Sequence, residues 1–194
     1  HTLFPYTTLF RSLWLPTLIK QFGGSDLSTG FVSAVPYIFG IIGLLIIPRS
    51  SDRLNDRYGH LAVLYVLGAI GLFLSAWLTM PVLQLAALCL VAFALFSCTA
   101  VFWTLPGRFF AGASAAAGIA LINSVGNLGG YIGPFVIGAL KEYTGNLASG
   151  LYFLSGVMVF GLFLTGVVYR LLERKHALAP TEFAASARSQ RAQP

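Results

Sequence analysis

The chain has 194 residues, of which 57% are hydrophobic and only 9% are charged, and its mean hydropathy is +0.80. Soluble domains usually carry about 25% charged residues, so this composition excludes an ordinary water-soluble globule. The net charge of +6 arises from 12 Lys and Arg against 6 Asp and Glu, but the basic residues lie in short clusters between long apolar runs. Such clusters are typical of membrane-flanking charge, not of nucleic-acid binding. We therefore expect an all-α integral membrane protein that contacts the lipid bilayer and binds no nucleic acid.

Residues 1–12 are expected to be foreign to the protein. The segment from Thr2 to Ser12 back-translates, in frame, to a nucleotide sequence that resembles a common sequencing adapter. A signal peptide is a poor alternative, because the segment has no basic stretch, no long apolar core and no small-residue cleavage site. We predict that residues 1–12 are a translated artefact and that the authentic sequence begins near Leu13.

Uncharged runs of the length that a helix needs to cross about 30 Å of hydrocarbon recur after Leu13. The expected spans are residues 27–47, 61–78, 82–105, 113–140 and 150–169. Residues 13–22 are too few to cross and are expected to form the end of a preceding helix. Pro48 is expected to end the first complete span. Together these segments predict a transmembrane helical bundle over residues 13–175.

The distribution of Lys and Arg predicts the orientation of the bundle, because cytoplasmic loops retain the excess of these residues. If the spans alternate in direction, one side collects Arg49, Arg53, Arg57, Arg108, Arg170, Arg174, Lys175, Arg188 and Arg191. The opposite side collects only Lys20 and Lys141. We therefore expect a cytoplasmic C terminus. The tail over residues 176–194, rich in Ala, Ser, Gln and Arg, is expected to be disordered.

The sequence offers no sign of an enzyme, a cofactor or a metal site. Its three histidines are scattered, and none lies within a predicted span. The motifs of nucleophile elbows, zinc proteases and phosphate-binding loops are also missing from it. We therefore expect that the protein is not an enzyme and holds no cofactor.

Two Asp-Arg pairs, Asp52-Arg53 and Asp56-Arg57, lie between the first two complete spans. Their spacing of four residues predicts that they share one face of a short helix beside the membrane. There, their carboxylates and guanidinium groups are able to latch helix ends together and control conformational change. A solvated loop of positive-inside charge is the alternative, and both remain open from the spacing alone.

Asn123, Asn127 and Tyr131 recur every four residues and form one polar stripe on the span at 113–140. A polar stripe is costly in hydrocarbon, so we expect it to face a substrate cavity, with hydrogen bonding to another helix as the alternative. Ser33 and Tyr37 share a face of the span at 27–47 and are further candidates for substrate binding. For Tyr37, packing against a neighbouring helix is the alternative role.

The loop from Arg49 to His60 resembles the Gly-x-x-x-Asp-Arg-x-Gly-Arg signature of the major facilitator superfamily, as it recurs in the second half of those transporters. Pro48 replaces its first glycine, and Gly59-His60 stands where Gly-Arg is expected. Further segments resemble the anion:cation symporter branch of that superfamily, and they are Leu15 to Gly23, Gly30 to Tyr37, Trp103 to Arg108, and Gly118 to Pro134. The resemblance implies the C-terminal six-helix half of such a transporter, from the end of helix seven through helix twelve, with the N-terminal half missing.

The same resemblance implies a secondary transporter in the inner membrane of a bacterium. It implies uptake of a small organic anion, such as a carboxylate or sugar acid, coupled to a proton or another cation. No ionisable residue lies within any complete predicted span, so we expect the charged groups for coupling and anion capture to lie mostly in the missing half. The alternative is a non-transporting membrane scaffold or sensor of the same fold.

Overall fold

The computed structural model describes the backbone of residues 26–109 and 113–191 and the side chains of residues 31–107 and 114–171. Its helices are α3 (Asp26–Leu54), α4 (Arg57–Trp77), α5 (Pro81–Phe102), α6 (Pro106–Phe109), α7 (Ala113–Thr144) and α8 (Ala148–Arg191). The predictions of an artefact at 1–12 and of a helix end at 13–22 lie outside these residues. Within them, every helix or strand is an α-helix, which confirms the predicted all-α class.

Five of these helices contain a segment that is long and apolar enough to cross a membrane. The segments are Phe31–Leu54, Arg57–Trp77, Pro81–Phe102, Ser114–Thr144 and Ala148–Leu171. Each corresponds to one of the five spans expected from the sequence. The apolar runs therefore identified the membrane-crossing helices of the described chain.

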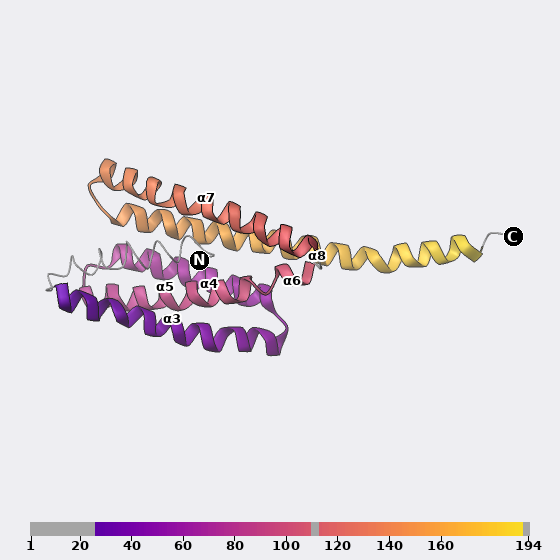
Figure 1. Ribbon diagram of the computed structural model, residues 1–194, viewed down its shortest axis with the longest axis horizontal. Coiled ribbons are helices and arrows are strands. Elements are labelled where there is room, and N and C mark those ends of the chain that lie inside the picture. The colour runs from indigo at the N-terminus through magenta and orange to yellow at the C-terminus, as the bar shows by residue number, and fades with distance from the viewer. Residues whose placement is uncertain (1–25, 110–112, 192–194) are drawn as a thin grey trace.

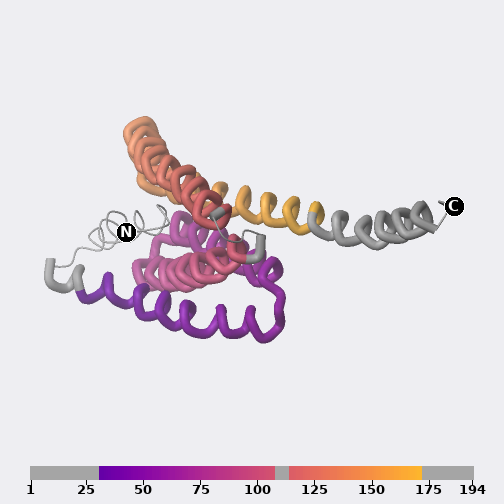
Figure 2. The backbone as a smooth tube through the Cα atoms, turned by 45° about the vertical axis from the view of Figure 1, so that its right-hand side comes forward, coloured from indigo at the N-terminus to yellow at the C-terminus, as the bar shows by residue number. Residues whose placement is uncertain are grey.

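The long helices pack side by side in an order that differs from their order in the chain (Figure 1). Helix α5 packs against both α3 and α4, and α8 packs against both α4 and α7. The spatial order is therefore α3, α5, α4, α8, α7. Figure 2 shows that the hairpin of α7 and α8 leans across the layer formed by the other three helices. Helices α3 and α7 form the two outer edges and bury the smallest shares of their surfaces, together with α8.

The core of the bundle lies where α4, α5 and α8 meet. Its most buried members include Leu72 of α4, Leu88 and Val91 of α5, and Leu151 and Met158 of α8. In a membrane, close van der Waals packing replaces the hydrophobic effect as the main source of helix association. The three central helices therefore form the core against which α3 and α7 pack.

Helix α3 meets α5 at a close contact that depends on glycine. A Cβ atom on Gly43 would lie 2.5 Å from Ser97 Oγ and 2.8 Å from the carbonyl oxygen of Phe93. The Ser97 hydroxyl is fixed in place, because it donates a 2.7 Å hydrogen bond to the same carbonyl. Any side chain at position 43 must therefore push the two helices apart.

Replacement of Gly43 by Ala is expected to destabilise the complete protein by about 1–3 kcal/mol, the usual cost of overpacking. Gly138→Ala is a matched control on α7, since a Cβ there meets nothing within 4 Å. Thermal unfolding in detergent micelles measures both variants. A lower transition temperature for Gly43→Ala alone is the expected result, and equal transitions for both variants would contradict the close contact.

Helix α3 does not end at Pro48, as the sequence predicted, but continues to Leu54. Proline removes one backbone donor, but membrane helices tolerate it where other groups satisfy the backbone. Pro48 leaves the carbonyl of Leu44, four residues earlier, without its helical donor, and the guanidinium of Arg49 donates to the neighbouring carbonyl of Leu45. The chain reverses only at Asn55, whose φ of 50° is in the left-handed region. The last charged turn of α3 is therefore helical.

Helix α8 continues to Arg191 and projects beyond the ends of the other helices (Figure 1). The sequence-based expectation was a disordered tail from residue 176. The helical backbone has a physical basis in composition, because the segment is rich in Ala and also contains Glu, Gln, Arg and Leu, all of which favour helices.

Candidate functional site

The two Asp-Arg pairs lie on two successive helices and not on one face of a short helix, which corrects the prediction. Asp52 and Arg53 belong to the last turn of α3. Asp56 is the N-cap of α4, and its Oδ1 accepts a 2.8 Å hydrogen bond from the backbone N–H of Gly59. The intervening left-handed residue, Asn55, separates the pairs, and spacing alone did not reveal it. The helix cap therefore fixes the direction in which α4 leaves the turn.

Arg57 joins the ends of three helices. Its Nη2 lies 2.8 Å from Asp52 Oδ1 on α3, and its Nη1 donates over 3.4 Å to the carbonyl of Thr104, just after α5. The Arg57 side chain is only 16% exposed, whereas that of Asp52 is 59% exposed. These contacts have the geometry of a latch between helix ends. A role in gating stays a prediction.

Three residues that the sequence analysis did not propose as site residues, His60, Ser50 and Ser51, support this latch. The His60 ring contacts the Asp56 carbonyl through Nδ1 and lies 3.2 Å from Ser50 Oγ through Nε2. Ser51, which is fully buried, donates to the Asp56 carbonyl over 3.4 Å. His60 occupies the position where the transporter signature has arginine. This difference from the signature was the feature of the sequence that could have identified His60 as part of the latch.

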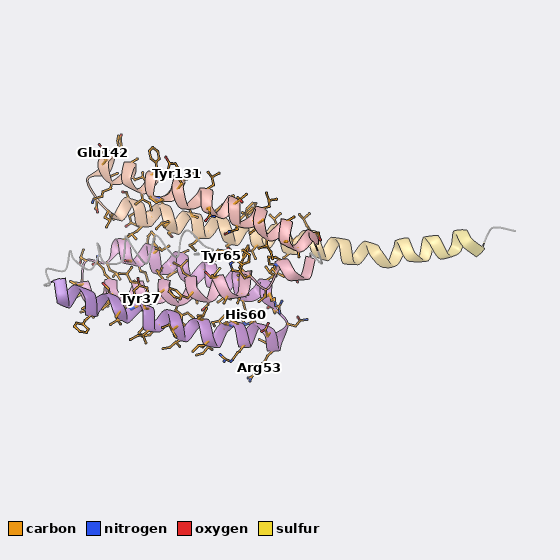
Figure 3. The ribbon with its side chains drawn as sticks, in the orientation of Figure 1. Tyr37, Arg53, His60, Tyr65, Tyr131 and Glu142 are labelled. Carbon is orange, nitrogen blue, oxygen red and sulfur yellow. The ribbon has the colours of Figure 1, made fainter. Side chains whose placement is uncertain are left out.

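The polar stripe of α7 faces away from α8. Ile137 is buried against Gly150 of α8, whereas Asn127 is exposed and Tyr131 is 75% exposed. In Figure 3 the Tyr131 ring projects outward from the bundle. Asn123 lies at the border of this face, and its buried Oδ1 has no hydrogen-bond partner among the described residues. Asn127 and Tyr131 thus present an amide group and a phenol group on the exposed face of a membrane helix.

Ser33 and Tyr37 take a different position. Ser33 is only 8% exposed, and the Tyr37 ring packs edge-on against Phe96 of α5, with centroids 6.3 Å apart. Figure 3 places Tyr37 and Tyr131 on opposite sides of the bundle. The structure therefore does not bring the two groups of candidate residues together. The contact with Phe96 supports the packing role that was the alternative for Tyr37.

Charge separates the two ends of the bundle. Arg53 and His60 lie at the end where α3 meets α4, and Glu142 lies at the opposite end (Figure 3). Between these ends, the described spans present only uncharged side chains to their surroundings. The amide groups of Asn123 and Asn127 on α7 can donate and accept hydrogen bonds but carry no charge.

A sequence model described as Major Facilitator Superfamily matches residues 7–192, so the chain belongs to this superfamily. The predicted family and the predicted partial membrane bundle are thereby confirmed. No solved structure matches the chain significantly.

Three relatives illustrate the similarity. The chain is 76% identical over 165 residues to a quinolone resistance transporter of Acinetobacter baumannii, an alignment that covers 84% of this chain and 38% of the relative. It is 41% identical over 158 residues to a protein of Agrobacterium vitis named as a tartrate transporter, and this alignment covers 81% of this chain and 36% of the relative. It is 33% identical over 150 residues to the inner membrane transport protein RhmT of Escherichia coli, and this alignment covers 76% of this chain and 35% of the relative. The chain therefore spans little more than a third of the length of these relatives.

Proposed function

We propose that the chain is the C-terminal half of a secondary transporter and that residues 13–175 form its helical bundle. The observation that carries the proposal is the exposed polar stripe of Asn127 and Tyr131 on α7, a helix that is otherwise apolar enough to cross a membrane. Exposed amides are costly in hydrocarbon, so a water-filled cavity or another protein surface should cover them. In transporters built from two repeats, the substrate site lies near the midplane between the halves.

The proposed substrate is a small organic anion, such as a carboxylate or sugar acid, taken up with a proton or another cation. Amide N–H and phenol O–H groups donate hydrogen bonds to carboxylates without requiring a charge. The relative named as a tartrate transporter supports this class of substrate. Under this proposal, the groups that carry the coupling ion and neutralise the anion belong to the missing half.

A quinolone is the second candidate substrate, and the 76% identity to a quinolone resistance transporter favours it. Quinolones are planar aromatic acids, so their carboxylate offers the same acceptors to the α7 stripe. Resistance requires export, whereas growth on an organic acid requires uptake. The two candidates therefore differ in the direction of transport as well as in the size of the substrate.

Transport by the complete protein in proteoliposomes, with an imposed proton gradient, tests both candidates. Labelled tartrate and a labelled quinolone serve as the two probes. Saturable, gradient-dependent flux of either compound supports transport and identifies the substrate class. Absence of flux for both, in correctly inserted protein, would contradict the proposed anion transport and favour a scaffold or sensor.

We further propose that the protein is a multi-pass protein of the bacterial inner membrane with a cytoplasmic C terminus. The orientation predicts that Tyr143, which is 93% exposed in the last turn of α7, faces the periplasm, and that Leu54, which is 69% exposed at the end of α3, faces the cytoplasm. A membrane-impermeant maleimide should label Tyr143→Cys in intact cells and should label Leu54→Cys only after lysis. The reverse pattern would overturn the orientation.

A further inference from the structure

His60 lies beside the turn that joins α3 to α4, at the same end of the bundle as Arg53 (Figure 3). Its Nε2 lies 3.2 Å from the hydroxyl of Ser50 on α3, and its Nδ1 contacts the backbone carbonyl of Asp56, the N-cap of α4. The ring is half-buried, so water at this end of the bundle can exchange protons with it. His60 therefore links α3 to α4 through a group that is able to bind a proton.

The contact with Asp56 determines which nitrogen of the neutral ring carries a hydrogen. A backbone carbonyl can only accept a hydrogen bond, so the nitrogen that contacts it, Nδ1, must be the one that donates. Nε2 of the neutral ring is then a bare acceptor, and the Ser50 hydroxyl donates to it. The buried Ser51 hydroxyl also donates to the Asp56 carbonyl, over 3.4 Å, so α3 helps to hold the group that orients the ring.

A proton added at Nε2 reverses the direction of the hydrogen bond between the two helices. Nε2 becomes a donor, and the Ser50 oxygen must accept where it previously donated. The hydroxyl hydrogen of Ser50 then needs another acceptor, and a helical serine has one in the carbonyl one turn earlier, which is that of Ile46. The donor of the bond between α3 and α4 therefore changes from Ser50 to His60 when the ring is protonated.

The charges around His60 are mostly positive. His60 is the fourth residue of α4, near the helix end where the aligned peptide dipoles present positive charge. The charged side chains described at this end of the bundle are Arg49, Asp52 and Arg53 on α3, Asp56 and Arg57 at the start of α4, and Arg170 on α8. Residues 81–107, which include α5, have no charged side chain, and the phenols of Tyr58 and Tyr169 stay neutral over the pH range in which histidine ionises. Protonation of His60 therefore adds a positive charge where arginines already outnumber aspartates.

We propose that His60 is a proton-binding site that makes the junction of α3 and α4 respond to pH. The neutral ring holds the two helix ends together through Ser50, and protonation weakens that contact. Imidazole suits this role because its charge changes between about pH 5 and pH 8, whereas an arginine at this position stays charged throughout. His60 is thus a positioning residue for the turn that also carries Arg57 and its contacts to Asp52 and Thr104.

Under the orientation proposed above, this junction faces the cytoplasm, so the proton comes from that side of the membrane. A neutral or alkaline cytoplasm keeps α3 and α4 joined at this end, and an acidic cytoplasm loosens them. The stabilisation from the contact is therefore present when the ring is neutral and is lost as the pH falls. Only the side of the membrane rests on the proposed function, because the contacts of His60 are independent of any substrate.

Thermal unfolding of the complete protein in detergent micelles, at about pH 8 and about pH 5, tests the proposal. The variants are His60→Gln, which cannot bind a proton, Ser50→Ala, which removes the partner of Nε2, and the two changes combined. Near pH 8 each single change should lower the transition temperature. The double variant should then lose no more than either single variant, because both changes remove the same hydrogen bond. Near pH 5 the difference between His60→Gln and the wild type should disappear.

Two further variants serve as controls. His60→Arg places a permanent charge at the same position and should lower the transition temperature near pH 8, and His176→Gln removes a histidine from the tail and should change nothing at either pH. A difference between His60→Gln and the wild type that is equal at both pH values would overturn the proposal, as would additive losses in the double variant near pH 8. The measurement needs no transport activity, so its outcome is separate from that of the proposed function. Elution as a monodisperse peak shows that each variant is folded.

Discussion

Replacing Asn127 with Ala in the complete protein is expected to reduce transport about tenfold or more and to leave membrane insertion unchanged. A hydrogen bond to a charged group contributes about 1.5–3 kcal/mol, which corresponds to roughly tenfold to a hundredfold in affinity. Asn127 is exposed on α7, so its amide contributes little to the packing of the described helices. Its loss should therefore affect the bound substrate and not the fold.

Ser124→Ala is the control for this experiment. Ser124 lies one turn earlier on the same helix and is also exposed, but its hydroxyl donates a 2.9 Å hydrogen bond to the carbonyl of Ala120. Its bonding potential is satisfied within the helix, so we expect transport within about twofold of wild type. Initial rates over a range of substrate concentrations, normalised to inserted protein, measure both variants. Unchanged kinetics in Asn127→Ala would exclude Asn127 from the substrate site.

The membrane spans were predictable because their signal is local. An uncharged run of about 20 residues must form a helix in a bilayer, since its backbone groups have no other hydrogen-bond partners there. The side-by-side order of the helices was not predictable in this way. Lipid and apolar side chains are similar surroundings, so the hydropathy of a helix does not say which neighbour it prefers.

The two groups of candidate site residues also show that a sequence pattern places residues on one face of a helix but does not say what that face contacts. The i, i+4 spacing correctly placed Asn127 and Tyr131 on one face of α7, and that face is exposed. The same spacing placed Ser33 and Tyr37 together, but the α3 face that contains Ser33 packs against α5. The small residues Gly40 and Gly43 lie near that face and set the close contact. In the sequence, the position of these two glycines near the same side of the helix as Ser33 was the available signal that this face packs against another helix.

The Asp-Arg loop was predicted as a motif, but its geometry depends on contacts far apart in the sequence. Arg57 reaches the carbonyl of Thr104, which is 47 residues away. The left-handed turn at Asn55 was equally hidden, because asparagine tolerates that conformation without requiring it. Residue type therefore indicated a latch, and the packing of α3, α4 and α5 determined which groups it joins.

Arg57→Ala is expected to loosen this latch and to lower transport about tenfold in the complete protein, if movement of the helix ends limits the cycle. The ion pair with the largely exposed Asp52 contributes only about 0–1 kcal/mol, because water screens it. The bond from the mostly buried guanidinium to the Thr104 carbonyl is long, at 3.4 Å, and adds about 1 kcal/mol. We therefore expect modest destabilisation, measured by thermal unfolding, beside a larger effect on transport rate.

Arg53→Ala separates the latch from the general charge of this end. Arg53 lies at the same boundary and is exposed, so its removal changes the positive-inside charge by the same amount as Arg57→Ala. If the contacts of Arg57 hold the three helix ends together, Arg53→Ala should keep nearly wild-type transport and unfolding temperature. Equal losses in both variants would show that the total charge matters here and that the contacts of Arg57 do not.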